Sequence, residues 1–353
     1  MTSARVKLAD VAKAAGVSQG TASNVFSRPE VVREEVRERV LGVARELGYR
    51  GPDIKGRLLR AGKVNAIGVA SIDRLAYFFE DPWARAMMTE IGRVCDATGT
   101  GLSLVSARNQ ERLAWNIGSA LVDGFILLCV EGEERLVELT RRRGLPFVAL
   151  AMSPREKSIA SIGVDNVGGG AAASRHLAAL GHRRIGVLAI GTHLSRTGPM
   201  RAAEALTGMG STSADRWRGY LEGLHAFGIE AEAVAVHMTH NDKATVEAAM
   251  QALFSAAEPP TALLAMADHA ALIAMEWLSA NGLSVPDDVS IVGFDDVPEA
   301  ALSTPGLTTV AQPMAEIARR AVSAILAEAP PEGQQILPVR LVTRGSTRPR
   351  AAR

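Results

Sequence analysis

The sequence predicts an α/β protein whose core has two doubly wound parallel-sheet lobes, with a small all-α domain at its N-terminus. From about residue 64 onward, short β-branched runs alternate with longer segments of helical periodicity. Such alternation is typical of βαβ units and parallel sheets. The pattern occurs in two successive sets, which indicates two similar lobes, whereas the first 50 residues show helical spacing.

Residues 8–26, LADVAKAAGVSQGTASNVF, have the spacing of two short helices that cross at a tight turn. Ala12 allows the helices to approach closely, Gly16 tolerates a left-handed turn, and Ser18 is placed to cap the second helix. A third helix over about 33–47 would close the unit. The residues expected in the shared apolar centre are Val11, Ala15, Val17, Ala22 and Val25, joined by Val36, Val40, Ala44 and Leu47.

The second helix would expose short polar groups that suit phosphates and base edges in a major groove. Residues 1–63 hold 13 Lys and Arg against 7 Asp and Glu, whereas the remainder holds 26 against 31. A basic head on a mildly acidic body is typical of a duplex-binding module joined to another kind of domain. The alternative is a buried helical hairpin without a DNA-binding role. The exposed face would consist of Gln19, Gly20, Thr21, Ser23 and Asn24.

Residues 51–63, GPDIKGRLLRAGK, are too short and polar to form a domain. Leu59, flanked by Arg57 and Arg60, could insert into a minor groove once DNA orders the segment. A plain linker is the alternative.

The composition indicates two or three domains, and 47% apolar residues suffice for sizeable cores. The sequence has neither an apolar run of membrane-spanning length nor the apolar core of a secretory signal at its N-terminus, so we expect no membrane association and a cytoplasmic location. Cys95 and Cys129 lack CxxC spacing, and we expect them to be reduced and buried.

Several stretches along nearly the whole chain together resemble the LacI/GalR (lactose-repressor) family. They are LADVAKAAGVSQGTASNVF, ARELGYRGPDIKGRLLRAGK, IGV at 67, VDGFILL at 122, HLAALGHRRIGVL at 176, DRWRGYLEGL at 215, PDDVSIVGFDDVPEA at 286 and LTTVAQP at 307. The resemblance implies a homodimer whose heads read a pseudo-palindromic operator in double-stranded DNA, with paired hinge helices that insert leucines such as Leu59 into the minor groove. It also implies a periplasmic-binding-protein-like core that binds a small-molecule effector, a sugar before other polyol-like metabolites.

Positions 19, 20 and 24 correspond to the family's main base-reading side chains. Asn24 stands where arginine is frequent, and because an amide favours adenine over guanine, the usual family operator cannot be assumed. Gly56 stands where alanine is usual, which should make hinge-helix formation cost about 1 kcal/mol more. The expected DNA-binding residues are Lys7, Ser18, Gln19, Gly20, Thr21, Ser23, Asn24, Tyr49 and Leu59.

We expect residues 1–50 to form the helix-turn-helix domain, 51–63 the hinge and 64–353 the effector-binding and dimerisation domain. Lobe 1 would contain about 64–163 and 295–326, and lobe 2 about 164–294 and 327–345. Doubly wound sheets bind ligands beyond the carboxyl ends of their strands, so the expected site is the cleft between the lobes. The candidate strands are NAIGVASI, GLSLVS, DGFILLCV and LPFVALA, followed by RIGVLAI, AVAVHM, TALLAM and VSIVGF.

An arginine and carboxylates after these strands could hold ligand hydroxyl groups, and aromatic rings could cover the apolar face of the ligand. By resemblance, five such residues match effector-contacting positions of the family. The alternatives are an interlobe ion pair for the arginine, helix capping for the aspartates and core packing for the rings. The segment 191–213, rich in turn formers, is expected to cover or edge the site. The candidates are Tyr77, Phe78, Arg216, Asp268 and Asp295, with Asp165 as a weaker one.

Other chemistry finds little support. His237 and His240 near Asp242 lack a further ligand, so we expect no metal site. The glycines 168–170 fit close packing better than a phosphate loop, and His176 and His182 would cap helix carbonyls. We expect no cofactor and no catalytic set.

The sequence therefore predicts a DNA-binding transcriptional regulator, a repressor rather than an enzyme, whose operator affinity a ligand changes by altering the separation of the hinges. A sugar-binding receptor or sensor core without a gene-regulatory role is the alternative.

Overall fold

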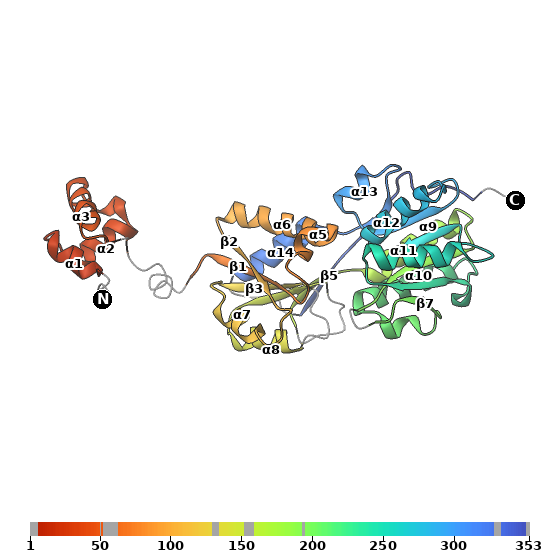
Figure 1. Ribbon diagram of the computed structural model, residues 1–353, viewed down its shortest axis with the longest axis horizontal. Helices are drawn as coiled ribbons and strands as arrows, with labels where there is room; N and C mark the ends of the chain where they lie inside the picture. Colours follow the sequence, from red (N-terminus) through yellow and green to blue (C-terminus); the bar gives the residue numbers. More distant parts are fainter. Residues whose placement is uncertain are drawn as a thin grey trace. The chain divides into compact units, whose positions relative to one another are not determined.

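The computed structural model describes residues 6–49, 51, 63–128, 134–151, 159–192, 195–327 and 333–350. The chain divides into two units, Met1–Val64 and Asn65–Arg353 (Figure 1). The expectations about Leu59, Gly56 and Cys129 fall outside the described residues and stay predictions.

The first unit contains three α-helices and one 3₁₀ turn among its described residues. Helix α1 spans Leu8–Ala14, α2 spans Gln19–Ser27, the 3₁₀ turn η1 spans Pro29–Val31 and α3 spans Glu34–Glu46. Gly16 has a φ of 66° in the turn between α1 and α2, which glycine adopts without strain. The buried centre consists of Val11, Ala12, Ala15, Ala22, Val25, Val40 and Ala44.

Leu47, expected in this centre, is 39% exposed because α3 ends at Glu46 and Leu47 is its C-cap residue. Val17 and Val36 are half-buried beside the cluster. The ring of Phe26 meets the ring of Tyr49 edge to face, with centroids 5.6 Å apart, which closes the unit on the side of α3's end.

The second unit contains two sheets that define two lobes (Figure 1). The sheet of lobe 1 has six parallel strands in the order β12-β5-β4-β3-β1-β2. Its strands are β1 (Ala66–Ser71), β2 (Gly101–Ser106), β3 (Gly124–Leu128), β4 (Phe147–Leu150), β5 (Ser161–Val164) and β12 (Gln334–Leu337). Its helices are α5 (Tyr77–Glu80), α6 (Pro82–Thr98), α7 (Leu113–Ser119), α8 (Glu134–Arg142) and α14 (Met314–Leu326).

The sheet of lobe 2 has the order β13-β11-β10-β9-β6-β8-β7, and only its two edge strands are antiparallel. Its strands are β6 (Ile185–Ile190), β7 (Gly198–Met200), β8 (Ala235–Thr239), β9 (Ala262–Ala265), β10 (Ser290–Asp295), β11 (Thr308–Ala311) and β13 (Arg340–Val342). Its helices are α9 (Asn166–Ala179), α10 (Ser211–His225), α11 (Lys243–Phe254), α12 (Asp268–Ala280) and α13 (Pro298–Leu302), with 3₁₀ turns η2 (Ala205–Gly208) and η3 (Ala231–Ala233).

The chain passes between the lobes three times, and two of these crossings lie later than expected. The first follows β5 at Val164, close to the expected Gly163. The second lies between β11 and α14 rather than near Asp295, because residues 308–311 pair with β10 in the sheet of lobe 2. The third lies between β12 and β13 rather than near Ala327, because residues 334–337 pair with β5 in lobe 1. The eight predicted strands are all present, and so is β5, the strand expected before Asp165, whereas the short strands β7, β11, β12 and β13 were not predicted.

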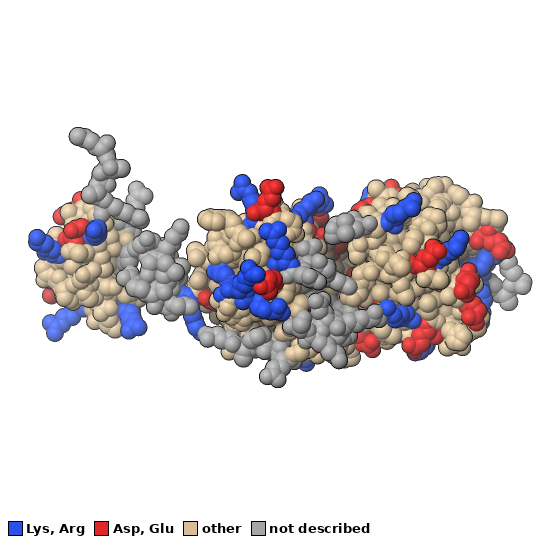
Figure 2. Space-filling view, turned by 90° about the horizontal axis from the view of Figure 1, so that it is seen from below, with Lys and Arg blue, Asp and Glu red and all other residues tan. Residues whose placement is uncertain are grey.

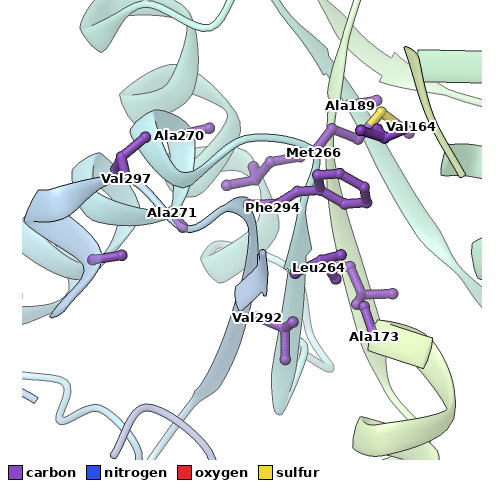
Figure 3. Packing of buried hydrophobic residues seen from close by; sticks show 14 of the residues in the cluster. Val164, Ala173, Ala189, Leu264, Met266, Ala270, Ala271, Val292, Phe294 and Val297 are labelled. Atoms are coloured by element: carbon purple, nitrogen blue, oxygen red, sulfur yellow. The ribbon is translucent and has the colours of Figure 1, made fainter. Parts of the chain in front are cut away.

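Glycines bring α9 and α10 of lobe 2 into close contact. A Cβ atom on Gly170 would lie 2.5 Å from the carbonyl oxygen of Arg216, and one on Gly219 would lie 2.1 Å from that of Val167. Gly169 faces the ring of Phe294 in β10, part of the buried cluster shown in Figure 3. Gly169 thus serves helix–sheet packing and Gly170 helix–helix packing, which fixes the backbone that carries Arg216, whereas Gly168 lies against the capping carboxylate of Asp165.

Among the described residues, no helix is both long and apolar enough to cross a bilayer. Cys95 is buried near the end of α6, and this burial raises the pKa of its thiol.

Candidate functional site

A cavity lies between the two lobes, beyond the carboxyl ends of several strands. The two lobes line it differently. From lobe 1 come mainly apolar and aromatic side chains: Tyr77, Trp83, Met87, Leu150, Ile162 and Ile317, together with the carboxylate of Asp81. From lobe 2 and the second crossing come mainly polar side chains: Asn166, Thr212, Ser213, Arg216, Asn241, His269, Asp295 and Gln312.

Arg216, on α10, is held by several contacts at once. Its Nε donates to Oδ1 of Asn166 at 2.9 Å, and its guanidinium also donates to the carbonyl oxygen of Met266. The guanidinium carbon lies 3.7 Å from the centroid of the Phe294 ring, within cation–π range. The side chain is 12% exposed, so the cation is nearly desolvated and fixed in direction at the cavity wall.

Asp295, at the end of β10, is the carboxylate beside this cation. Its Oδ1 lies 3.6 Å from the Arg216 guanidinium and accepts a 2.6 Å hydrogen bond from Nε2 of Gln312. Burial raises the pKa of Asp295 well above its usual value, while Arg216 acts in the opposite direction. Both partners belong to lobe 2, so the pair is not the interlobe ion pair considered as the alternative role of Arg216.

Asp81, from lobe 1, reaches across to lobe 2. Its Oδ1 caps α6 by accepting from the amide of Ala84 at 2.9 Å. Its Oδ2 accepts from Nδ2 of Asn241 at 3.3 Å and lies 3.7 Å from Nδ1 of His269. The lobes are also joined by an ion pair between Arg85 on α6 and Glu299 on α13.

Three of the six expected effector residues line the cavity: Tyr77, Arg216 and Asp295. The structure places the other three elsewhere. Phe78 is 1% exposed and packs in the core, because the short helix α5 turns it inward. Asp165 accepts from the amide of Gly168 at 2.8 Å and caps α9. Asp268 is fully buried, and its carboxylate accepts from the amide of Val297 and the hydroxyl of Thr309.

Sequence reasoning missed several polar residues that line the cavity. Asn241, His269 and Gln312 each lie within four residues of the carboxyl end of a strand, and Asn166 lies two residues after β5. A search for polar residues after the carboxyl end of every expected strand could have found Asn166, Asn241 and His269, whereas β11, which precedes Gln312, was not predicted. Asp81 and Trp83 lie within YFFEDPW, a stretch whose bulk and carboxylate suggest a place at the cleft mouth.

Among its described residues, the segment 191–213 edges the cavity only at its end. It carries the edge strand β7 and the turn η2, and its described residues at the cavity are Thr212 and Ser213. His176 and His182 do not cap helix carbonyls as expected: His176 bonds the Thr347 hydroxyl, and His182 bonds the Thr261 hydroxyl and the Arg348 carbonyl. In the described part of the chain, no cluster of His, Cys, Asp and Glu could hold a metal ion.

The first unit presents the expected polar face on α2. Gln19, Gly20 and Asn24 are exposed, whereas Thr21 and Ser23 are half-buried. Ser18 caps α2 by accepting from the amide of Thr21 at 3.0 Å. The exposed Lys7 precedes α1, and Tyr49 is half-buried against Phe26.

Charge on the helical part of this unit is nearly balanced. Residues 6–49 hold seven Lys and Arg against six Asp and Glu, and Figure 2 shows both kinds on the visible face. Residues 50–63 hold five against one, so the basic excess belongs largely to the segment after the helical unit.

Comparison with known proteins agrees with this architecture. The model of the bacterial regulatory proteins, lacI family, matches residues 7–51, and that of the periplasmic binding protein-like domain matches residues 174–347. An HTH-type transcriptional regulator from Mycobacterium tuberculosis is 34% identical over 344 residues, which cover 95% of this chain and 94% of that protein.

Solved structures show the same fold. The complex of the transcriptional regulator CelR with cellobiose is 28% identical, with a TM-score of 0.68 over 97% of this chain and 100% of that one. The lac repressor dimer bound to operator and the anti-inducer ONPF is 27% identical, with a TM-score of 0.73 over 98% of this chain and 100% of that one.

A helix-turn-helix head and a two-lobed, periplasmic-binding-protein-like core define a DNA-binding transcriptional regulator. The chain belongs to the lacI family of bacterial regulatory proteins. The predicted family, fold class and regulatory function are confirmed.

Proposed function

We propose that this regulator binds a small hydroxyl-bearing effector, a sugar or related polyol, in the cavity between its lobes, and that occupancy of the cavity changes its affinity for operator DNA. The proposal rests on Arg216, whose guanidinium is fixed by Asn166, Met266 and Phe294 and is nearly excluded from solvent. A preorganised guanidinium beside a carboxylate suits vicinal hydroxyl groups, which accept from one and donate to the other. The CelR structure with cellobiose gives a precedent in a relative.

The lining suggests how binding is coupled to movement. Because lobe 1 supplies mainly apolar walls and lobe 2 mainly polar partners, a ligand is fully enclosed only when the lobes lie together. Such a ligand stabilises one arrangement of the lobes over another, which is the differential affinity that allosteric coupling needs.

On the DNA side, we propose that a homodimer reads a pseudo-palindromic operator through Gln19, Gly20 and Asn24, and that it acts in the cytoplasm as a repressor. The exposure of these three residues on α2 supports this role. The other expected residues would contact the DNA phosphate backbone or support helix α2. They are Lys7, Ser18, Thr21, Ser23 and Tyr49. The basic segment 50–63 would add phosphate contacts and carry Leu59 to the minor groove.

Selection of genomic fragments by the purified full-length protein tests both parts. The selected operator should show a two-fold repeat, and its affinity should shift when the small-molecule fraction of a bacterial extract is added. Arg216→Ala should abolish the shift while operator binding without extract remains. Leu59→Ala should weaken operator binding and leave the effector affinity unchanged. A preference for no fragment over random duplex would contradict the DNA part, and a shift that persists in Arg216→Ala would contradict the effector part.

A further inference from the structure

Three of the described residues that line the cavity each have a buried polar atom without a hydrogen-bond partner. Six buried side-chain nitrogen or oxygen atoms of the described residues have no partner, and three of them belong to residues that line the cavity. These three are Nε1 of Trp83, Oδ1 of Asn241 and Nδ1 of His269. An unmet buried hydrogen-bonding group is unfavourable, so a ligand that meets all three gains affinity.

The three residues come from both lobes and gather around Asp81. Trp83 lies two residues after Asp81 on α6 of lobe 1, while Asn241 follows β8 and His269 lies in the first turn of α12 in lobe 2. Nδ2 of Asn241 already donates to Asp81, which leaves its Oδ1 available as an acceptor. The hydrogen bonds of Arg216 run instead to Asn166 and Met266, so the cluster around Asp81 forms a second polar centre in the same cavity.

Backbone geometry supports a fixed role for Asn241. Its φ is 56°, in the left-handed region that asparagine adopts more readily than most residues. This conformation holds the amide at the end of β8, directly before the N-cap of α11 at Asp242.

We infer that Trp83, Asn241 and His269 form a subsite for an uncharged hydroxyl-bearing end of the ligand, and that Asp81 excludes anionic groups from it. This inference rests on the proposed effector function and deepens it. A hydroxyl group is both donor and acceptor, so neighbouring hydroxyls can accept from the indole N–H and donate to the amide oxygen. A phosphate or carboxylate can only accept once ionised, and it would face the carboxylate of Asp81.

The electrostatics of the whole cavity point the same way. Among the described residues that line it, Arg216 is the only lysine or arginine, and it is already beside Asp295. A ligand anion placed at the subsite would therefore find no unpaired arginine or lysine among these lining residues.

A binding panel on the full-length protein tests the inference. The probes are cellobiose, glucose and ribose, with cellobiose 6′-phosphate, glucose 6-phosphate and ribose 5-phosphate as their anionic counterparts, all measured by titration calorimetry. We expect at least one uncharged sugar to bind and its anionic counterpart to bind at least about tenfold more weakly. Trp83→Phe, which keeps an aromatic ring but removes the N–H, should raise the dissociation constant about tenfold, as should His269→Ala.

The chain offers a matched control. Trp217 also has a buried indole nitrogen without a partner in the described residues, but it does not line the cavity. Trp217→Phe should leave sugar affinity unchanged, and the thermal midpoint of each variant shows whether it has folded.

Three results would overturn the inference: an anionic probe that binds as tightly as its uncharged counterpart, variants at Trp83 and His269 that bind like the control, or no binding of any uncharged probe. The proposed function would survive each of these if the extract still shifted operator affinity in an Arg216-dependent way.

Discussion

The two lobes share a doubly wound architecture, but they present opposite chemistry to the cavity. Lobe 2 supplies Arg216 and Asp295, whose directions are fixed by hydrogen bonds within lobe 2 or to the second crossing. Lobe 1 supplies rings and aliphatic side chains, and its carboxylate at the cavity, Asp81, already caps a helix. The difference suggests that lobe 2 supplies the fixed charged pair that binds the ligand, while lobe 1 covers the ligand and adds Trp83 and Asp81 at one end.

Removal of the fixed cation should produce the largest effect. Arg216→Ala should weaken effector binding more than about a hundredfold, because charge-assisted hydrogen bonds are lost and Asp295 is left buried without its cation. It should also lower the free energy of unfolding by about 3 kcal/mol. Titration calorimetry and urea unfolding of the full chain measure both. An effector affinity close to that of wild type would mean that lobe 2 does not carry recognition.

Displacement of the backbone behind Arg216 should have the next largest effect. In Gly170→Ala the new methyl group would meet the carbonyl oxygen of Arg216, so α9 and α10 must separate, at a cost of about 1 to 3 kcal/mol of stability. Effector affinity should fall with it. Gly118→Ala is the matched control, because a Cβ on this exposed helical glycine meets nothing within 4 Å. Equal stability of the two variants would contradict the close packing of α9 on α10.

The pH dependence of stability tests the buried carboxylate of Asp268. Burial raises its pKa to about 6, so between about pH 4 and pH 6 the folded chain binds a proton that the unfolded chain has released. This group therefore stabilises the fold at low pH, and that contribution is lost as the pH rises through 6, by about 1.4 kcal/mol for each pH unit that separates the pKa values of the folded and unfolded chains. Compared with wild type, Asp268→Asn should show a smaller loss of unfolding free energy between pH 4 and pH 6. Parallel curves for the two proteins would contradict the raised pKa.

The apolar wall of lobe 1 should give the smallest effect. Tyr77→Ala removes one ring from the cavity and should weaken effector binding about fivefold, or about 1 kcal/mol. Phe79→Ala, two residues along the same short helix, is the control because Phe79 is 65% exposed and does not line the cavity. If Tyr77→Ala lowered effector affinity as much as Arg216→Ala does, the proposed difference between the lobes would be contradicted.

Much of the fold followed from periodicity, because buried parallel strands of four to six residues stand out between longer helical segments. The short strands β11 and β12 did not, since their residues, TTVA and QQIL, are half polar and form no apolar run. Because β11 pairs with β10 and β12 pairs with β5, two of the three lobe crossings lie later in the chain than predicted.

The candidate site was predicted only in part, for a related reason. Asp295 was found because a polar residue at a strand end has a clear meaning in a doubly wound sheet, whereas Arg216, on a helix, was found by its match to an effector-contacting position of the family. Asp268 also follows a strand, yet its carboxylate accepts hydrogen bonds from Val297 and Thr309 inside lobe 2. These contacts depend on tertiary packing, so the local sequence could not predict them. The subsite at Trp83, Asn241 and His269 joins three separate strand-to-helix connections from two lobes, so only the structure could assemble it.

Occupancy of the cavity is proposed to change the affinity of the helix-turn-helix unit for operator DNA. The most direct measurement is the operator dissociation constant of the full-length protein, with and without the small-molecule fraction of a bacterial extract, for wild type and Arg216→Ala side by side. We predict a shift of about fivefold or more in wild type and none in the variant, since coupling between sites typically spans about 5- to 150-fold. An unchanged dissociation constant in wild type, or an equal shift in both proteins, would contradict the account.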